Sequence, residues 1–195
     1  MTDPDPTTLR DEPVDPEVVS SELVYSGRVW DVRSDTVRYG DGEIVRQYVD
    51  HPGAAAVVAV DAQDRVLLIQ QYRHPIRHRD WEIPAGLLDV AGEDPLQAAQ
   101  RELAEEADLA AQDWDPLVSV FTTPGGNDEV VHLFLARRLA PVGTAHAREE
   151  EEADIRTEWV PLDDVVTGVL HGRLRNGILA VGVLAAAERL RRSGH

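Results

Sequence analysis

Acidic side chains are concentrated in the stretch GLLDVAGEDPLQAAQRELAEEADL, which runs from residue 86 to 109. Glu102 and Glu106 are four residues apart and would share one face of a helix, with Glu105 beside them and Glu93 shortly before. Like charges at this spacing usually destabilise a helix by roughly 0.2–0.5 kcal/mol. Because Mg²⁺ and Mn²⁺ prefer oxygen ligands, the stretch indicates either a divalent-metal site or an ordinary solvated face.

The element that positions these carboxylates is a predicted helix over residues 94–107. Asp94 followed by Pro95 is typical of a helix start, because aspartate caps the first turn and proline fits its first position. Arg101 lies four residues before Glu105 and can pair with it. An apolar stripe that could pack on a core is formed by Leu96, Ala99, Leu103 and Ala107.

The same stretch resembles the Nudix box, G-x5-E-x7-R-E-U-x-E-E-x-G-U, in which U is an aliphatic residue. Two features depart from that pattern: six residues instead of five separate Gly86 from Glu93, and Asp108 replaces the late glycine. The extra residue precedes the helix, so the register of the helical carboxylates is kept. Aspartate adopts a left-handed backbone more readily than most residues, so Asp108 can still end the helix. The residues that match are Gly86, Glu93, Arg101, Glu102, Leu103, Glu105, Glu106 and Leu109.

The resemblance implies a Nudix hydrolase, an enzyme that cleaves a nucleoside diphosphate linked to another group and depends on Mg²⁺ or Mn²⁺. Arg101 and Glu105 would have catalytic roles, with Arg101 orienting the glutamates. The implied metal ligands are Glu102 and Glu106 directly, Glu93 and Glu105 close by or recruited with substrate, and the backbone carbonyl of Ala85.

The flanks of the box are similar to those of ADP-ribose and ADP-sugar pyrophosphatases. The segments QYR and WEIPAG precede the box, and Pro124 lies 16 residues after Asp108. This likeness implies hydrolysis of ADP-ribose to AMP and ribose 5-phosphate. Two alternatives stay open: a pyrophosphatase for UDP- or GDP-sugars, and a Nudix-like sensor that binds ADP-ribose without cleaving it.

The subfamily resemblance also implies substrate-binding residues outside the box. Trp30 would stack on adenine, and Arg46 and Gln47 would sandwich or hydrogen-bond it. Arg73 would hold phosphate or ribose, and Glu82 would bind the terminal ribose or a metal through water. The simpler interpretations are a half-buried strand tryptophan for Trp30, a surface arginine for Arg73 and a strand-end carboxylate for Glu82.

A general base is implied on the loop before the last strand, where the sequence reads EEEEAD. Glu152 is the first candidate and Glu151 the second, by their spacing to the strand at Trp159. A plain acidic loop is the alternative.

The order of the elements predicts an α/β fold: a Nudix-type α/β/α sandwich with a mixed sheet, plus an N-terminal antiparallel β-meander. We expect a flexible acidic tail over 1–20, a β region for dimerisation and the adenine site over 21–51, and a Nudix domain with a C-terminal helix over 52–195. Within these, strands are expected at 23–39 and 43–51, as a pair at 53–61 and 65–73, at 117–123 and at 129–139.

Composition limits the possible partners. The 195 residues include no cysteine, and all 19 basic residues are arginine, which excludes disulfides, thiolate metal sites and lysine Schiff-base chemistry. A net charge of −17 argues against nucleic-acid and anionic-membrane binding. No apolar run approaches a membrane helix and no signal peptide is evident, so we expect a cytoplasmic protein. The subfamily resemblance implies a homodimer that acts on a nucleoside diphosphate sugar.

Overall fold

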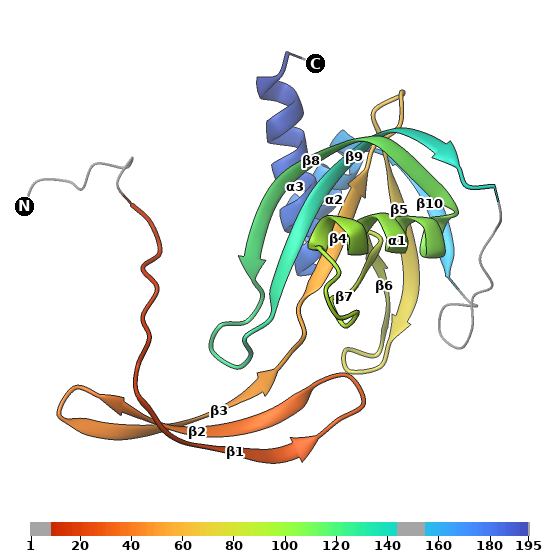
Figure 1. Ribbon diagram of the computed structural model, residues 1–195. Helices are drawn as coiled ribbons and strands as arrows, with labels where there is room; N and C mark the ends of the chain where they lie inside the picture. The colour runs from red at the N-terminus through yellow and green to blue at the C-terminus, as the bar shows by residue number, and fades with distance from the viewer. Residues whose placement is uncertain (1–8, 144–154, 195) are drawn as a thin grey trace, which may run out of the picture. The chain divides into compact units, whose positions relative to one another are not determined.

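The computed structural model describes residues 9–143 and 155–194 (Figure 1). The chain divides into two compact units, Met1–Asp50 and His51–His195. Each unit has its own sheets, and each is described by itself below.

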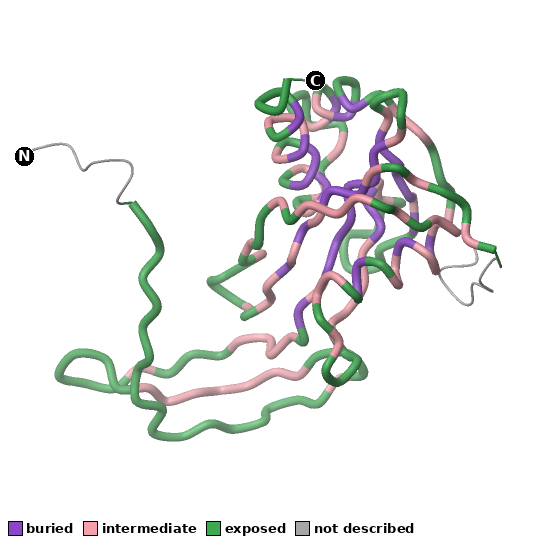
Figure 2. The backbone as a smooth tube through the Cα atoms, turned by 45° about the horizontal axis from the view of Figure 1, so that its top comes forward, coloured by how far each residue is buried: buried purple, intermediate pink, exposed green. Residues whose placement is uncertain are grey.

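The first unit is a three-stranded antiparallel sheet in the order β1-β2-β3, formed by β1 (Val18–Ser26), β2 (Asp31–Tyr39) and β3 (Gly42–Asp50). A two-residue turn joins Tyr39 to its partner Gly42, and Gly40 has the positive φ of 60° that such tight hairpins need. The predicted β-meander is thus confirmed. Its first strand begins at Val18, within the segment expected to be a tail. None of residues 9–50 is buried (Figure 2).

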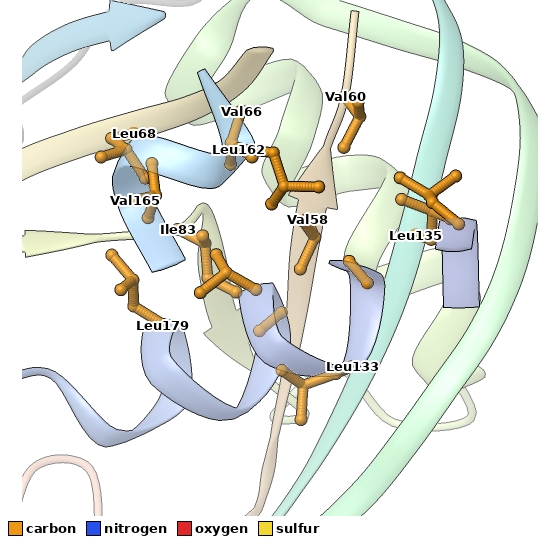
Figure 3. Close-up of a cluster of buried hydrophobic side chains, with 14 of the residues drawn as sticks. Val58, Val60, Val66, Leu68, Ile83, Leu133, Leu135, Leu162, Val165 and Leu179 are labelled. Carbon is orange, nitrogen blue, oxygen red and sulfur yellow. The ribbon is translucent and has the colours of Figure 1, made fainter. Parts of the chain in front are cut away.

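The second unit is organised around β4 (Ala54–Ala59), whose side chains alternate between two cores. Ala56 and Val58 face the core built with α2 (Leu162–Leu170) and α3 (Gly177–Arg192) (Figure 3). Ala55 and Val57 face the core built with α1 (Pro95–Ala107). Because strand side chains alternate while helices pack on both faces, the layers are helix, sheet, helix. The predicted α/β/α sandwich is confirmed.

Two sheets make up the middle layer. One has the order β7-β4-β9-β8, with β7 (Ala85–Leu87), β8 (Leu109–Phe121) and β9 (Val130–Pro141); the other has the order β10-β5-β6, with β5 (Arg65–Arg73), β6 (His78–Glu82) and β10 (Arg156–Pro161). β4 and β9 run parallel, while the other ladders are antiparallel, so the first sheet is mixed as predicted.

The expected pairing of segments 53–61 and 65–73 is wrong. A single bridge between Val60 and Val66 joins their ends, and β4 and β5 then enter different sheets. The physical reason is that both edges of β4 are already occupied, one by β7 and the other by β9.

Strand β8 begins at Leu109, directly after α1, and not at residue 117 as expected. Its first half, LAAQDWDP, mixes polar and apolar residues without a clear alternation and contains Pro116. A proline is tolerated there because β8 is the edge strand of its sheet, and the register shifts between Pro116 and Val118. The short strands β6 and β7 have no counterpart in the strands expected from the sequence.

Helix α3 packs very closely on the sheet at Gly182. A Cβ atom at this position would lie 2.9 Å from Leu133, 3.0 Å from Val58 and 3.1 Å from Ile83. Leu133 and Val58 belong to the sheet, and Ile83 follows β6 directly. Glycine therefore allows α3 to approach β4, β9 and the residue that follows β6. Among the described residues, no helix combines the length and apolar character needed to span a bilayer.

Candidate active site

Helix α1 is capped at both ends by residues that the sequence singled out, Asp94 and Asp108. The Asp94 carboxylate accepts the Leu96 N–H at 2.9 Å, and the Gln97 side chain accepts the Asp94 N–H at 3.1 Å, which completes a capping box. Asp108 ends the helix with a left-handed backbone of φ 55° and ψ 34°, and its N–H donates to Ala104 O at 3.1 Å. Aspartate thus fills the conformation for which the Nudix pattern has glycine.

Arg101 gathers the carboxylates around one guanidinium. Its Nε and Nη2 donate to the two oxygens of Glu93 at 3.1 and 2.9 Å, and its Nη1 donates to Glu105 at 3.2 Å. The same Nη1 also donates to Glu102, and Nη2 reaches the carbonyl of Leu87 at 3.4 Å. The extra residue before Glu93 therefore does not carry that carboxylate away from the helix, since both of its oxygens bind Arg101.

This arrangement fixes the charges of the pair. The hydrogen bonds from Arg101, more than its charge alone, lower the pKa of the Glu93 carboxyl, although desolvation acts in the opposite sense. Glu93 in turn is the main cause of the raised pKa of Arg101. Both groups therefore stay ionised throughout the neutral range.

Strand β7 contacts two of the helical carboxylates, those of Glu102 and Glu106. Glu106, which is only 7% exposed, accepts the Ala85 N–H at 2.9 Å. At the next residue, a Cβ on Gly86 would lie 1.9 Å from Glu102 Oε1. Glu102 and Glu106 thus contact neighbouring residues of β7, as their spacing of four on the helix allows. Gly86 is needed because the Glu102 carboxylate occupies the space of a side chain.

The donor set suits a hard divalent cation. The four glutamates and the carbonyl of Ala85 offer oxygen only, as Mg²⁺ and Mn²⁺ prefer. Within residues 9–143 and 155–194, no three His, Cys, Asp or Glu side chains already stand together in an arrangement that could hold a metal ion. The carboxylates of Glu93, Glu102 and Glu105 instead converge on Arg101, so binding a cation would require some of them to turn away from it.

Two predicted substrate residues of the second unit bind each other. Arg73 at the end of β5 donates from Nε and Nη2 to the two oxygens of Glu82 on β6, at 2.7 and 2.8 Å. Glu82 is buried and Arg73 is exposed. Two parallel bonds hold the guanidinium plane in one orientation. Ala85, which contacts Glu106, lies three residues beyond Glu82.

The predicted adenine-site residues lie in the first unit. Trp30 precedes β2 and is 43% exposed. Arg46 and Gln47 are exposed neighbours on β3, where Arg46 Nη1 donates to Val45 O at 2.9 Å and Gln47 Nε2 to Ser34 Oγ at 3.3 Å. Adjacent strand residues point to opposite faces, so one adenine ring could contact only one of the two within a subunit. The candidate bases Glu151 and Glu152 lie outside the described residues.

The loop that contains Pro124 is anchored by residues that sequence reasoning missed. The His51 N–H donates to Asp128 at 2.9 Å, and His51 Nδ1 lies 3.6 Å from Glu129. Glu129 also accepts the Thr122 hydroxyl at 2.6 Å, which ties the two ends of the loop together. A separation of 77 residues between His51 and Asp128 leaves no local sequence signal for this anchor.

Comparison with known proteins identifies the family of this chain. A family model described as "NUDIX domain" matches residues 50–178. The chain is 45% identical to an ADP-ribose pyrophosphatase of Mycobacterium tuberculosis over 87% of its own length and 82% of that protein. It is 34% identical to a methanol dehydrogenase activator of Bacillus methanolicus over 90% and 95% of the two chains.

A solved structure titled "Crystal structure of ADP compounds hydrolase" superposes with a TM-score of 0.75 and covers 95% of this chain and 99% of that one. At 22% identity this likeness concerns the fold. The match of the family model over most of the second unit, and the strong similarity to its relatives, lead to one conclusion. The chain belongs to the Nudix family.

Proposed function

We propose that this protein is a hydrolase that cleaves the diphosphate of ADP-ribose to AMP and ribose 5-phosphate. The observation that carries the proposal is the box itself: Glu93, Glu102 and Glu105 converge on Arg101, and Glu106 binds the backbone of β7. The similarity to the M. tuberculosis ADP-ribose pyrophosphatase supports this substrate. A sensor that only binds would not need every acid of the box in place.

The box residues would hold a divalent metal, Mg²⁺ or Mn²⁺, through Glu102, Glu106 and the Ala85 carbonyl, with Glu93 and Glu105 as further ligands. Such a metal, when bound, supplies positive charge that neutralises the diphosphate and stabilises the leaving oxygen. Arg101 keeps Glu93 ionised, as the lowered pKa of that carboxyl indicates, and its hydrogen bonds hold Glu102 and Glu105 beside it. Glu106 is additionally aligned by its bond to the Ala85 N–H.

Arg73 and Glu82 are the proposed substrate contacts next to the box. Two hydrogen bonds to Glu82 hold the guanidinium of Arg73 in one orientation. The exposed side of the group can then contact a phosphate or ribose. Trp30, with Arg46 or Gln47, is the proposed adenine contact. Trp30 as a residue is 43% exposed, and an exposed aromatic residue is available for stacking on a base.

Glu152 is the proposed general base, with Glu151 as the second candidate. This assignment rests on the family resemblance and on the position of the two glutamates before β10. The test is the pair Glu152→Gln and Glu151→Gln: we expect the first to reduce kcat strongly and the second to change it little. Full kcat in Glu152→Gln, beside an inactive Glu106→Gln variant, would contradict the assignment.

The first unit is proposed to form a homodimer. None of its described residues, 9–50, is buried, and five large apolar side chains of β1 are between 45% and 60% exposed: Val18, Val19, Leu23, Val24 and Tyr25. A three-stranded sheet without a core needs another surface to cover it. We expect Leu23→Glu to yield monomers in size-exclusion chromatography with light scattering, and the control Val14→Glu, in the exposed segment before β1, to stay dimeric. The cytoplasmic location stays a prediction.

The substrate is tested with purified protein, Mg²⁺ or Mn²⁺, and a panel of ADP-ribose, other ADP-sugars, UDP-glucose and a GDP-sugar. We expect AMP release from ADP-ribose with the highest kcat/KM, and none after EDTA treatment. Faster cleavage of UDP-glucose would replace the substrate but keep the site. Binding of ADP-ribose without turnover under both metals would favour the sensor.

A further inference from the structure

A positively charged surface lies on the second unit, in a chain whose net charge is −17. It consists of the β5–β6 hairpin, residues 71–79, and the connection from α2 into α3, residues 171–179. These two stretches contain five arginines, three histidines and no acid: Arg73, His74, Arg77, His78, Arg79, His171, Arg173 and Arg175. The two stretches carry a formal charge of +5, so the remaining chain carries −22; Glu82, which binds Arg73, and Asp80, which binds Asn176, adjoin them and lower the local sum to +3. We call these eight side chains the basic patch.

The two stretches meet through specific contacts although they are almost one hundred residues apart. Arg175 Nη2 lies 2.9 Å from His78 Nε2, and Asn176 Nδ2 donates to Asp80 at 3.1 Å. Arg173 Nη1 lies 3.3 Å from His171 Nδ1 on the same connection. The patch is therefore one continuous surface, with Asp80 facing the amide of Asn176.

The side chains of the patch are accessible. All eight of its residues are exposed, as is Ile76 at the tip of the hairpin. Helix α3 starts at Gly177 with Asn176 as its N-cap and no acid in its first turn, so the positive end of a 16-residue helix adds to the field of the patch. An exposed guanidinium group can bind two oxygens of a phosphate at once, in the same way that Arg73 binds the two carboxylate oxygens of Glu82.

We propose that the basic patch binds small phosphorylated anions and captures the anionic substrate before it reaches the box. This rests on the proposed function, since the substrate is a diphosphate. Strand β6 leads from the patch at His78 to Glu82, and Ala85 at the box follows three residues later. At about 3.3 Å per residue, the seven steps from His78 to Ala85 span at most about 23 Å.

The size of the ligand follows from the charge of the rest of the chain. At physiological ionic strength a charge is screened beyond about 8 Å, so a small anion at the patch is attracted by the nearby arginines and is little affected by distant acids. A nucleic-acid strand would extend beyond the patch over a surface that is strongly acidic overall. A small, multiply charged phosphate compound is therefore the favoured occupant.

The first test measures binding without catalysis. Pyrophosphate is titrated by calorimetry into the protein in EDTA, for wild type, for Arg173→Gln with Arg175→Gln, and for Arg191→Gln with Arg192→Gln as a control of equal charge at the other end of α3. We expect binding to weaken about five- to tenfold in the patch variant alone, as loss of two charged contacts predicts. The Arg173→Lys, Arg175→Lys variant should recover most of it, because it keeps the charge.

The second test measures capture of substrate. The patch variant should lower kcat/KM for ADP-ribose about fivefold at low salt, leave kcat unchanged, and approach wild type at high salt. Equal pyrophosphate affinity in wild type and patch variant, or tighter binding of a single-stranded oligonucleotide than of pyrophosphate, would overturn the proposal. Because the binding test does not involve turnover, an inactive protein that still binds pyrophosphate at the patch refutes the proposed function alone.

Discussion

The box on α1 and the N-terminal sheet are both assigned to the same substrate, yet their side chains are held in opposite ways. In the box, Arg101 donates to three carboxylates and a carbonyl, while β7 donates to Glu106 through Ala85 and leaves room for Glu102 at Gly86. In the sheet, none of residues 9–50 is buried. Arg46 there donates to the carbonyl of the preceding residue, Val45. The box is positioned by its own unit, whereas the sheet needs a second surface.

This contrast separates the two parts of the proposed function, cleavage of the diphosphate and recognition of adenine, into the two units of the chain. Chemistry at the diphosphate depends on spacing along one helix and one short strand, so single changes there should alter kcat. In the proposed function, recognition of adenine depends on exposed side chains such as Trp30, so changes there should alter KM. The following predictions test that division, from the largest effect to the smallest.

Glu106→Gln should give the largest effect, a fall in kcat of about 10²–10³-fold, because it removes a charge where the diphosphate must be stabilised. The amide oxygen can still accept the Ala85 N–H, so the fold should be retained. AMP release and a thermal melt measure the two properties. Glu43→Gln removes an exposed carboxylate from β3 and serves as the control. Equal losses of kcat in both variants would contradict the division between the units.

Gly86→Ala should reduce kcat about 10- to 100-fold, because the new Cβ would lie 1.9 Å from Glu102 Oε1 and displace that carboxylate. Little stability should be lost, since the clashing atoms are the end of a flexible side chain. Gly42→Ala on β3, where a Cβ meets nothing within 4 Å, is the matched control. A large drop in melting temperature with normal kcat per folded molecule would show that Gly86 serves the fold and not the site.

Trp30→Ala should raise KM for ADP-ribose about tenfold and leave kcat unchanged, as expected for loss of stacking on a base. Tyr39→Ala, at the opposite hairpin of the same sheet and 70% exposed, controls for loss of an aromatic ring. Steady-state kinetics provides both constants. An unchanged KM in the Trp30 variant would show that Trp30 is an ordinary half-exposed residue of the first unit and does not contact the substrate.

Arg101→Gln should raise the pKa of Glu93 toward its ordinary value of 4.5, since hydrogen bonds from Arg101 are the main cause of its lowering. A lowered pKa in the folded state stabilises the protein above pH 4.5, and this stabilisation is lost as the pH falls through the folded pKa. The unfolding free energy of the variant should therefore depend less on pH in this acidic range. A ¹³C NMR titration of Glu93 checks the pKa, with Arg38→Gln in the first unit as the control; an unchanged Glu93 titration in Arg101→Gln would contradict the assignment.

The helix and its caps could be predicted from sequence because their determinants are local. Asp94, Pro95 and Asp108 act within one turn of their own position, and the spacing of Glu102 and Glu106 fixes their common face. The pairing of the strands was harder to predict from the sequence. The partners of β4 are β7 and β9, and nothing local in residues 54–59 distinguishes them from β5, which follows at once.

The contacts that complete the site could not be predicted from the sequence either. The carbonyl of Leu87 as a partner of Arg101, and the bond between Arg73 and Glu82, depend on how α1, β7, β5 and β6 come together. The polar first half of β8 has no clean alternation, because an edge strand can carry Pro116 and a register shift. Such contacts and strand positions are determined by tertiary packing and not by the propensities of single residues.

The absence of a side chain at Gly182 on α3 affects the backbone between Glu82 and Ala85, which belongs to the candidate active site. Its missing side chain lets the helix press on Ile83, the residue between Glu82 and Pro84, and the Pro84 carbonyl accepts the Val57 N–H at 2.8 Å. The backbone that presents Glu82 on one side and Ala85 on the other is thus supported from behind by α3. Variation at position 182 could tune the catalytic geometry of homologous enzymes although it touches neither substrate nor metal.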